Sequence, residues 1–253
     1  MKTIAVIPAR YQSSRLPGKP LKDICGKPMV WWVYQQTKKV PAFDEVYVAT
    51  DDKRIEAVCE SFHIPVIMTS VDNPTHINRV HEVSKMISAD IYAVICGDEP
   101  LINSEIIEKV LPSPEAAQEK YIVRALMREF TDPAEVIDPG NIKIAANLNG
   151  ECMYLSRSPI PFPYKTVLFK YRKIVGIECY NKAALDFFVN APVGYLEKIE
   201  DIAILRFMEN KVGMNFTLVD TNALSVDTEK DLEKVRLIVA DMMETKLKSM
   251  ECK

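Results

Sequence analysis

The sequence contains little glycine and little histidine, and neither residue occurs in the spacing of a familiar cofactor motif. Only 8 of its 253 residues are glycine, and the chain has no G-x-G-x-x-G and no G-x-x-x-x-G-K-[ST] motif. These absences argue against an NAD-dependent dehydrogenase and against Walker-type phosphate binding. The 3 histidines, His63, His76 and His81, are too few for a histidine-rich metal site.

The chain also lacks paired cysteine motifs and long apolar runs. Its 6 cysteines are scattered without C-x-x-C spacing, which is typical of reduced thiols rather than of a disulfide frame or a zinc site. No apolar run approaches the roughly 20 residues of a membrane span. The run that follows Met1–Thr3 covers about five residues, too few for the apolar region of a signal peptide. We therefore expect a cytoplasmic protein.

An excess of positive charge is missing as well. The 32 Lys and Arg residues are balanced by 35 Asp and Glu residues, which gives a net charge of -3. The basic face of a nucleic-acid-binding or membrane-surface protein is therefore not expected. With 48% hydrophobic and 26% charged residues, the composition is that of a globular protein. We predict neither nucleic acid nor membrane as a partner.

The first part of the chain alternates short β-branched apolar runs with segments of helical apolar spacing. Such an order predicts an α/β fold with a right-handed, mostly parallel central sheet. Strands are predicted from Ile4 and at 45–50, 65–68 and 91–96, and helices at 29–39, 53–62 and 78–88.

The second part, beyond a helix predicted at 104–111, changes pattern. Strands are predicted at 121–128, 142–146, 153–155, 172–180 and 216–219, and helices at 183–189, at 195–209 and from Thr228, where Thr228 to Asp231 form a capping box. We interpret residues 1–253 as a single domain that carries a smaller mixed-sheet lobe at about 150–200.

Three cations follow the first predicted strand. Pro8 and Ala9 end the apolar run, and Arg10, Arg15 and Lys19 lie in the polar segment after it. Ligands of open α/β sheets bind beyond the carboxyl ends of the strands, so this concentration of cations predicts a polyphosphate site. The alternative is that the three cations are ordinary surface charges.

Two acids occupy comparable places further along the chain. Asp98, followed by Glu99, ends the strand expected to be central, and Asp227 lies between the last strand and the last helix. Carboxylates that face a polyphosphate site suit Mg²⁺, which prefers oxygen ligands. Together with the cations they outline nucleotidyl transfer, with Arg10, Arg15, Lys19 and Asp98 as the catalytic group. The alternative for each acid is a helix cap.

An ordered series of motifs extends over nearly the whole chain. They are Pro8-Ala9-Arg10 through Leu21, Ala49-Thr50-Asp51, Gly97-Asp98-Glu99-Pro100, Tyr154-Leu155-Ser156-Arg157 with Ile160-Pro161, Leu196 to Glu200, and Val226 to Leu232. This series closely resembles the 3-deoxy-manno-octulosonate (KDO) cytidylyltransferases.

The resemblance implies a Rossmann-like nucleotidyltransferase fold, with a smaller dimerisation lobe, in a homodimer. It also implies a Mg²⁺-dependent reaction in which CTP and a sugar acid give a CMP-sugar for surface polysaccharide synthesis and release pyrophosphate. The roles that it implies are phosphate binding by Arg10, Arg15 and Lys19, metal binding by Asp98 and Asp227, and nucleotide contacts by Pro8, Ala9, Thr75 and Arg79.

The acceptor pocket departs from the family pattern. Cys96 replaces a glutamine, residues 75–79 replace a Ser-Gly-Thr-Glu-Arg loop in which only Arg79 is kept, and Ile174, Glu178 and Ala203 replace a histidine, a tyrosine and a glutamate. Arg157, as an anion anchor, and Glu200 are retained. Replacing side chains that hydrogen-bond sugar hydroxyls removes about 0.5–1.5 kcal/mol for each bond.

These departures leave the acceptor open. We expect an anionic acceptor other than KDO, and Glu178 favours an amino-substituted sugar acid or another zwitterion, because its carboxylate would attract an amine. A phosphate or phosphonate acceptor is an alternative, and so is KDO itself, bound by other residues. A nucleotide-binding paralogue without catalysis is another, although a mere binder has little use for both Asp98 and Asp227. Cytosine preference follows only from the overall resemblance.

Overall fold

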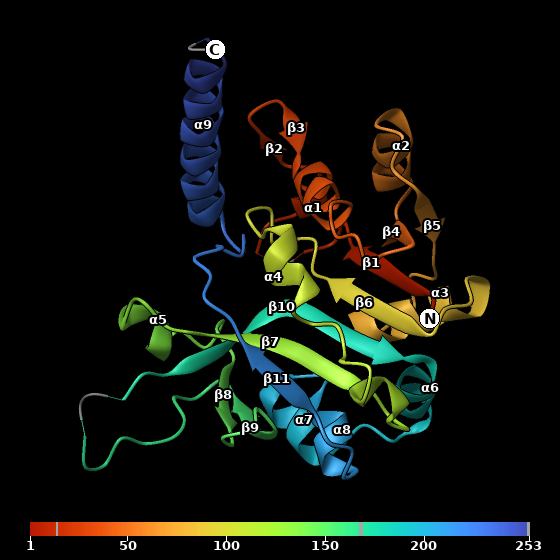
Figure 1. Cartoon of the computed structure of the whole chain (residues 1–253), viewed down its shortest axis with the longest axis vertical. Helices are drawn as coiled ribbons and strands as arrows, with labels where there is room; N and C mark the ends of the chain where they lie inside the picture. The colour runs from red at the N-terminus through yellow and green to blue at the C-terminus, as the bar shows by residue number, and fades with distance from the viewer. Residues whose placement is uncertain (14, 167–168, 252–253) are drawn as a thin grey trace.

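The computed structural model describes residues 1–13, 15–166 and 169–251. They form a separate two-stranded sheet and a main sheet with helices packed on it (Figure 1). Its strands run in the order β11 (Asn215–Leu218), β7 (Val123–Glu129), β10 (Arg172–Asn181), β6 (Ile91–Ile95), β1 (Thr3–Ala9), β4 (Glu45–Thr50) and β5 (Val66–Met68). Neighbouring strands pair in parallel except at β10, which is antiparallel to both β6 and β7. The predicted α/β fold with a mostly parallel sheet is confirmed.

Side chains of β1 alternate between two cores, one on each face of the sheet. Ala5 and Ile7 pack with α1 (Met29–Thr37), α2 (Lys53–Ser61) and α4 (Ser104–Glu108). Ile4 and Val6 belong to the other core, with α3 (His76–Met86), α6 (Lys182–Asn190) and α8 (Leu205–Glu209). Because both faces are covered, β1 and β6 read as continuous apolar runs in the sequence, as buried parallel strands do.

Smaller elements complete the chain. They are the 3₁₀ turns η1 (Lys19–Leu21) and η2 (Ala116–Gln118), the two-residue strands β2 (Asp23–Ile24) and β3 (Lys27–Pro28), helix α5 (Ala134–Ile137), and the hairpin of β8 (Lys143–Ala146) and β9 (Cys152–Ser156). At the turn of that hairpin, Gly150 has a φ of 83°, which a residue with a Cβ rarely adopts.

The last helix, α9 (Glu229–Glu251), extends away from the sheet in Figure 1. It starts with the predicted capping box, in which Thr228 and Asp231 exchange hydrogen bonds between side chain and backbone. Leu232 and Val235 of its first turns pack with Ile24 and Met29 near the start of the chain. The two ends of the sequence are thereby held together.

One predicted helix is wrong in detail. The single helix expected at 195–209 is two helices, α7 (Tyr195–Glu200) and α8, because Asp201 adopts a left-handed conformation with a φ of 51°. Of the stretch predicted as a smaller lobe, about 150–200, β10 lies inside the main sheet between β6 and β7. Within the described ranges, no helix is both long and apolar enough to span a membrane.

Candidate active site

The segment after β1 and the turn after β6 border one cavity. β1 and β6 are parallel neighbours, so both end at the same edge of the sheet. The cavity beyond that edge measures about 370 Å³. It is lined by Pro8, Ala9, Arg10, Gln12, Ser13, Arg15, Lys19, Pro20, His76, Cys96, Gly97 and Asp98. We call it the first cavity.

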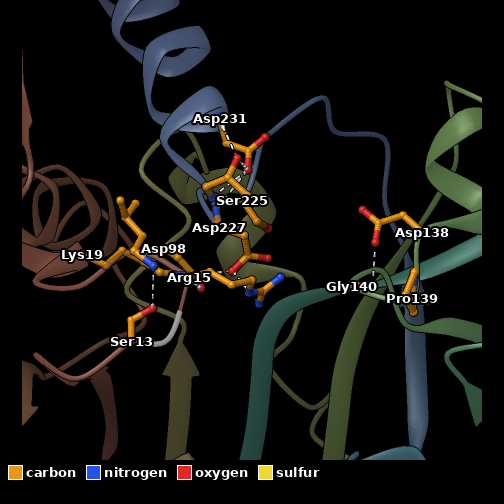
Figure 2. A network of polar contacts seen from close by, with 12 residues as sticks. Ser13, Arg15, Lys19, Asp98, Asp138, Pro139, Gly140, Ser225, Asp227 and Asp231 are labelled. Atoms are coloured by element: carbon orange, nitrogen blue, oxygen red, sulfur yellow. Dashed lines mark hydrogen bonds and ion pairs between the residues drawn. The ribbon is translucent and has the colours of Figure 1, made fainter.

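Two cations and two acids of this region, Arg15, Lys19, Asp98 and Asp227, form one connected cluster (Figure 2). The Nζ of Lys19 lies 3.0 Å from Oδ2 of Asp98 and 2.9 Å from Oδ1 of Asp227. The same Oδ1 of Asp227 accepts a hydrogen bond of 3.0 Å from Arg15. Lys19 is the most buried of these four side chains, with 13% exposed, and its ammonium group therefore links the first segment of the chain to both carboxylates.

Asp227 is brought to Asp98 by contacts of the two preceding residues. The backbone N–H of Val226 donates to the carbonyl oxygen of Asp98 over 2.9 Å. The hydroxyl of Ser225 donates to Oε1 of Glu99. Since Thr228 supplies the cap of α9 and Asn103 that of α4, neither Asp227 nor Asp98 serves as a helix cap, and both carboxylates remain available for chemistry.

Burial and neighbouring charge perturb two titratable groups at this edge. Burial, together with the Asp98 carboxylate, raises the pKa of Glu99 to about 7. Burial acts to lower the pKa of Lys19, but Asp98 and Asp227 outweigh it and leave that pKa above its ordinary value. Lys19 is accordingly a permanent cation at neutral pH.

A second cavity, of about 390 Å³, adjoins the first. It is lined by Arg10, Pro74, Thr75, His76, Ile142, Ile174, Glu178, Asp201, Ile202, Ala203 and Ile204. Arg10 and His76 line both cavities. The two side chains therefore mark the boundary at which the two cavities meet.

A charge pair lies at that boundary, with Glu178 buried and His76 part-exposed. Nε2 of His76 is 2.7 Å from Oε2 of Glu178, and the hydroxyl of Tyr180 donates to the same oxygen over 2.7 Å. Burial acts to raise the pKa of Glu178, but His76 and Tyr180 lower it below its ordinary value. Burial acts to lower the pKa of His76, and Glu178 outweighs this and raises it. Both directions favour the ionised pair.

Comparison with known proteins shows which family has this sequence and fold. A family model described as Cytidylyltransferase matches residues 4–226. The chain belongs to the cytidylyltransferase family. It is 38% identical over 239 residues to the 3-deoxy-manno-octulosonate cytidylyltransferase of Escherichia coli, covering 94% of this chain and 96% of that protein.

Two further proteins are similar to this chain, one in sequence and one in structure. The 8-amino-3,8-dideoxy-manno-octulosonate cytidylyltransferase of Shewanella sp. (strain W3-18-1) is 35% identical over 237 residues, covering 92% of this chain and 97% of that protein. A solved structure of CMP:2-keto-3-deoxy-manno-octonic acid synthetase complexed with CTP superposes with a TM-score of 0.88 at 37% identity, covering 96% of this chain and 100% of that one. The resemblance inferred from the motifs is confirmed.

Most residues predicted for the nucleotide lie together in this cytidylyltransferase. Pro8, Ala9, Arg10, Arg15, Lys19 and Asp98 all line the first cavity. Thr75 caps α3 and lines the second cavity instead. Arg79 is fully buried and pairs with Asp51 at 2.8 Å. Its guanidinium holds α3 to the end of β4, and in this structure it does not reach either cavity.

The residues predicted for the acceptor divide into two groups. Ile174, Glu178 and Ala203 line the second cavity, and Cys96 lines the first. Arg157 lines neither cavity, because its guanidinium donates to the backbone oxygens of Pro139, Glu200 and Asp201. Glu200 accepts from the hydroxyl of Ser156 and the backbone N–H of Arg157. These contacts give Arg157 and Glu200 a structural role, and they hold the break between α7 and α8.

His76 is a site residue that sequence reasoning missed. It was visible only as a departure from the family loop, and its partner Glu178 lies 102 positions away. The expectation that Glu178 attracts an amine stays a prediction. His76 and Tyr180 both contact Oε2 of its carboxylate, so an amine would share that carboxylate with them. His76 and Glu178 both depart from the family pattern. Considering these two departures together could have predicted that the two side chains form a pair.

The donor set fits Mg²⁺ in its chemistry. In the described part of the chain no group of three or more His, Cys, Asp and Glu side chains converges to hold a metal. Asp98 and Asp227 alone supply hard carboxylate oxygens, joined through Lys19. A site with so few protein ligands is typical of Mg²⁺ that also takes oxygens from substrate phosphates and water.

Proposed function

We propose that this cytidylyltransferase transfers CMP from CTP to a sugar acid of the KDO class and releases pyrophosphate. The observation that carries the proposal is the cluster of Arg15, Lys19, Asp98 and Asp227 at the edge of a cavity that adjoins a second one. One cavity for the nucleotide and one for the acceptor is what a two-substrate transfer needs. The names of the Escherichia coli and Shewanella relatives support both substrates.

The cations act on the triphosphate in this proposal. Arg10, Arg15 and Lys19 bind its oxygens and stabilise the negative charge that develops on the departing pyrophosphate. Asp98 and Asp227 hold Mg²⁺, which when bound neutralises phosphate charge and favours attack at phosphorus. Burial and the nearby Arg79 lower the pKa of Arg10 without discharging it, so Arg10 stays a cation at the boundary with the acceptor cavity.

The proposed reaction takes place between a substrate in each cavity. An oxygen of the acceptor hydroxyl bonds to the α-phosphorus of CTP, the bond from that phosphorus to the β-phosphate oxygen breaks, and the hydroxyl proton passes to solvent or a nearby base. The reacting atoms have to lie where the cavities meet, beside Arg10 and His76. Both substrates held there react as if in one molecule, which removes much of the entropic barrier.

Pyrophosphate release tests this function. The protein is incubated with Mg²⁺, a sugar acid (KDO or its 8-amino analogue) and each of CTP, UTP and ATP in turn. We expect release with CTP that depends on the acceptor, and at least tenfold less with UTP or ATP. Equal rates with UTP or ATP would defeat the nucleotide assignment. Absence of release with every combination would instead support a nucleotide-binding paralogue without catalysis.

A second copy of the chain and a cytoplasmic site of action belong to the same proposal. Phe162 and Tyr164, in the proline-rich segment after β9, are 80% and 84% exposed. Large apolar side chains presented in this way support burial against a partner. We expect a homodimer, which light scattering coupled to size exclusion measures directly. CTP and a product for surface polysaccharide synthesis are consistent with action in the cytoplasm.

A further inference from the structure

The second cavity has an apolar wall. Ile142, Ile174, Ile202, Ala203 and Ile204 contribute side chains from β10, the start of β8 and the segment between α7 and α8. None of these five lines the first cavity. The charged neighbour Asp201 is at the rim, where its side chain is 97% exposed. A ligand group that reaches this wall therefore meets hydrocarbon.

Two polar groups of the second cavity, Arg10 and His76, also line the first cavity and so lie towards the nucleotide. Thr75 lines the second cavity as well, and its hydroxyl donates to Oδ1 of Asn78. The His76 charge is balanced by Glu178, which is only 6% exposed and also accepts from Tyr180. Arg10 donates to the backbone oxygen of Asn73 and pairs with no carboxylate among the described residues. Arg10 is thus the available cation for an acceptor carboxylate.

The positions of the polar and apolar residues determine how a sugar acid can be oriented in the second cavity. The reacting hydroxyl of a 2-keto sugar acid is on the carbon next to the carboxylate, and both have to be at the boundary with the nucleotide. The remaining carbons then extend away from that boundary, towards the isoleucines and Ala203. A hydroxyl or an ammonium that packs against these side chains loses water and gains no hydrogen-bond partner from them.

We propose that the acceptor is a sugar acid whose end remote from the transferred hydroxyl terminates in a methyl group, supplied by a deoxygenated carbon or by an acyl cap. The inference rests on the proposed function and narrows its substrate class. It also explains why the wall replaces groups that hydrogen-bond hydroxyls: a methyl group buried against isoleucine gains free energy that a hydroxyl does not.

Four acceptors that differ only at carbon 8 test the inference. They are KDO with a hydroxyl, 8-amino-3,8-dideoxy-manno-octulosonate with an ammonium, its N-acetyl derivative, and 8-deoxy-KDO with a terminal methyl group. With CTP and Mg²⁺, we expect kcat/KM for the 8-deoxy or the N-acetyl compound to exceed that for KDO by about tenfold or more, with the ammonium compound lowest. The two methyl-bearing compounds separate a deoxygenated tail from an acyl cap.

A reciprocal change of the wall sharpens the test. The double variant Ile174→His, Ala203→Glu introduces polar side chains, and we expect it to move the ratio of kcat/KM values towards KDO by about tenfold. Ile199→Glu is the matched control, since Ile199 is 62% exposed on α7 and lines neither cavity. The control should leave the ratio unchanged. If the double variant fails to fold, the comparison of the four acceptors with the unaltered chain is the deciding test.

The outcomes separate this inference from the proposed function. A kcat/KM for KDO or the 8-amino compound that equals or exceeds those of both methyl-bearing compounds overturns the inference and leaves the cytidylyltransferase activity standing. Pyrophosphate release that none of the four compounds stimulates overturns the proposed function, and the inference with it. If the double variant kept the preference for methyl-bearing acceptors, the apolar wall of the second cavity would not be its cause, and the inference would also be overturned.

Discussion

The two cavities differ in how their charges are held. In the first cavity, Lys19 lies between Asp98 and Asp227, whose side chains are 29% and 30% exposed. In the second, Glu178, whose side chain is only 8% exposed, is paired with His76, and most of the remaining lining residues are apolar. Carboxylates that water still reaches can exchange their partners for a ligand, whereas a buried carboxylate is costly to leave unpaired. The first cavity is thus built for ionic chemistry and the second for shape.

The largest expected effect concerns the carboxylates of the first cavity. Asp98→Asn or Asp227→Asn should lower kcat by about a hundredfold or more, because loss of a charged oxygen ligand weakens Mg²⁺ binding while the amide preserves packing. Pyrophosphate release at saturating Mg²⁺ measures this. Asp220→Asn, at an exposed position between β11 and α9, is the matched control. Near-normal turnover of either variant would remove that residue from the metal site.

Lys19→Met should have the next largest effect, because it removes the cation that the two carboxylates share. We expect kcat to fall about a hundredfold. A cation bound between Asp98 and Asp227 no longer competes with Lys19 for their oxygens, so Mg²⁺ should raise the Tm of the variant more than that of the unaltered chain. Thermal unfolding with and without Mg²⁺ measures this. Lys22→Met, which removes a looser ion pair of 3.6 Å outside the cavity, should respond to Mg²⁺ as the unaltered chain does.

Arg157→Met separates a structural role from an anchor for the acceptor. Its guanidinium donates to three backbone oxygens over 2.6 to 2.9 Å, so the variant should lose about 2 kcal/mol of unfolding free energy. Chemical denaturation measures that loss, and steady-state kinetics measure KM for the acceptor. A tenfold rise in KM at unchanged stability would return Arg157 to the acceptor site and weaken the contrast between the cavities.

The smallest expected effect is a pH dependence of the pair formed by His76 and Glu178 in the second cavity. The pKa of His76 is raised above 6.5 and that of Glu178 lowered below 4.5. The ion pair therefore makes its full contribution to the free energy of unfolding between about pH 4.5 and 6.5. This contribution is lost as the pH rises through the folded pKa of His76. His76→Gln should lower the Tm by about 1 to 3 °C more at about pH 6 than at about pH 9.

His81 provides a control of opposite sign. Burial lowers its pKa below 6.5, so it destabilises the fold as the pH falls below about 6.5. His81→Gln should therefore lower the Tm less at about pH 6 than at about pH 9. If both variants showed the same trend with pH, the pair of His76 and Glu178 would not be ionised as described.

The sequence carried more information about the first cavity than about the second. The strand that leads to Arg10 and the strand that leads to Asp98 are recognisable because buried parallel strands leave unbroken apolar runs, and the strand ends locate the site. The pairing of His76 with Glu178 leaves no local pattern, because the two residues lie 102 positions apart, in α3 and β10. The left-handed Asp201 was missed for a similar reason: its conformation accompanies carbonyl contacts from Arg157, which no local pattern encodes.

The contact of Lys19 with Asp227 spans 208 positions in the sequence. Closing so long a loop is entropically unfavourable until the intervening strands have docked. We therefore expect the cluster of Arg15, Lys19, Asp98 and Asp227 to form late in folding, after the strands that separate its members in sequence. Trp31 and Trp32, the 2 tryptophans of the chain, both lie in α1 near its start. During refolding, their fluorescence reports on local packing around α1, while the return of enzymatic activity reports that the two ends of the chain have met.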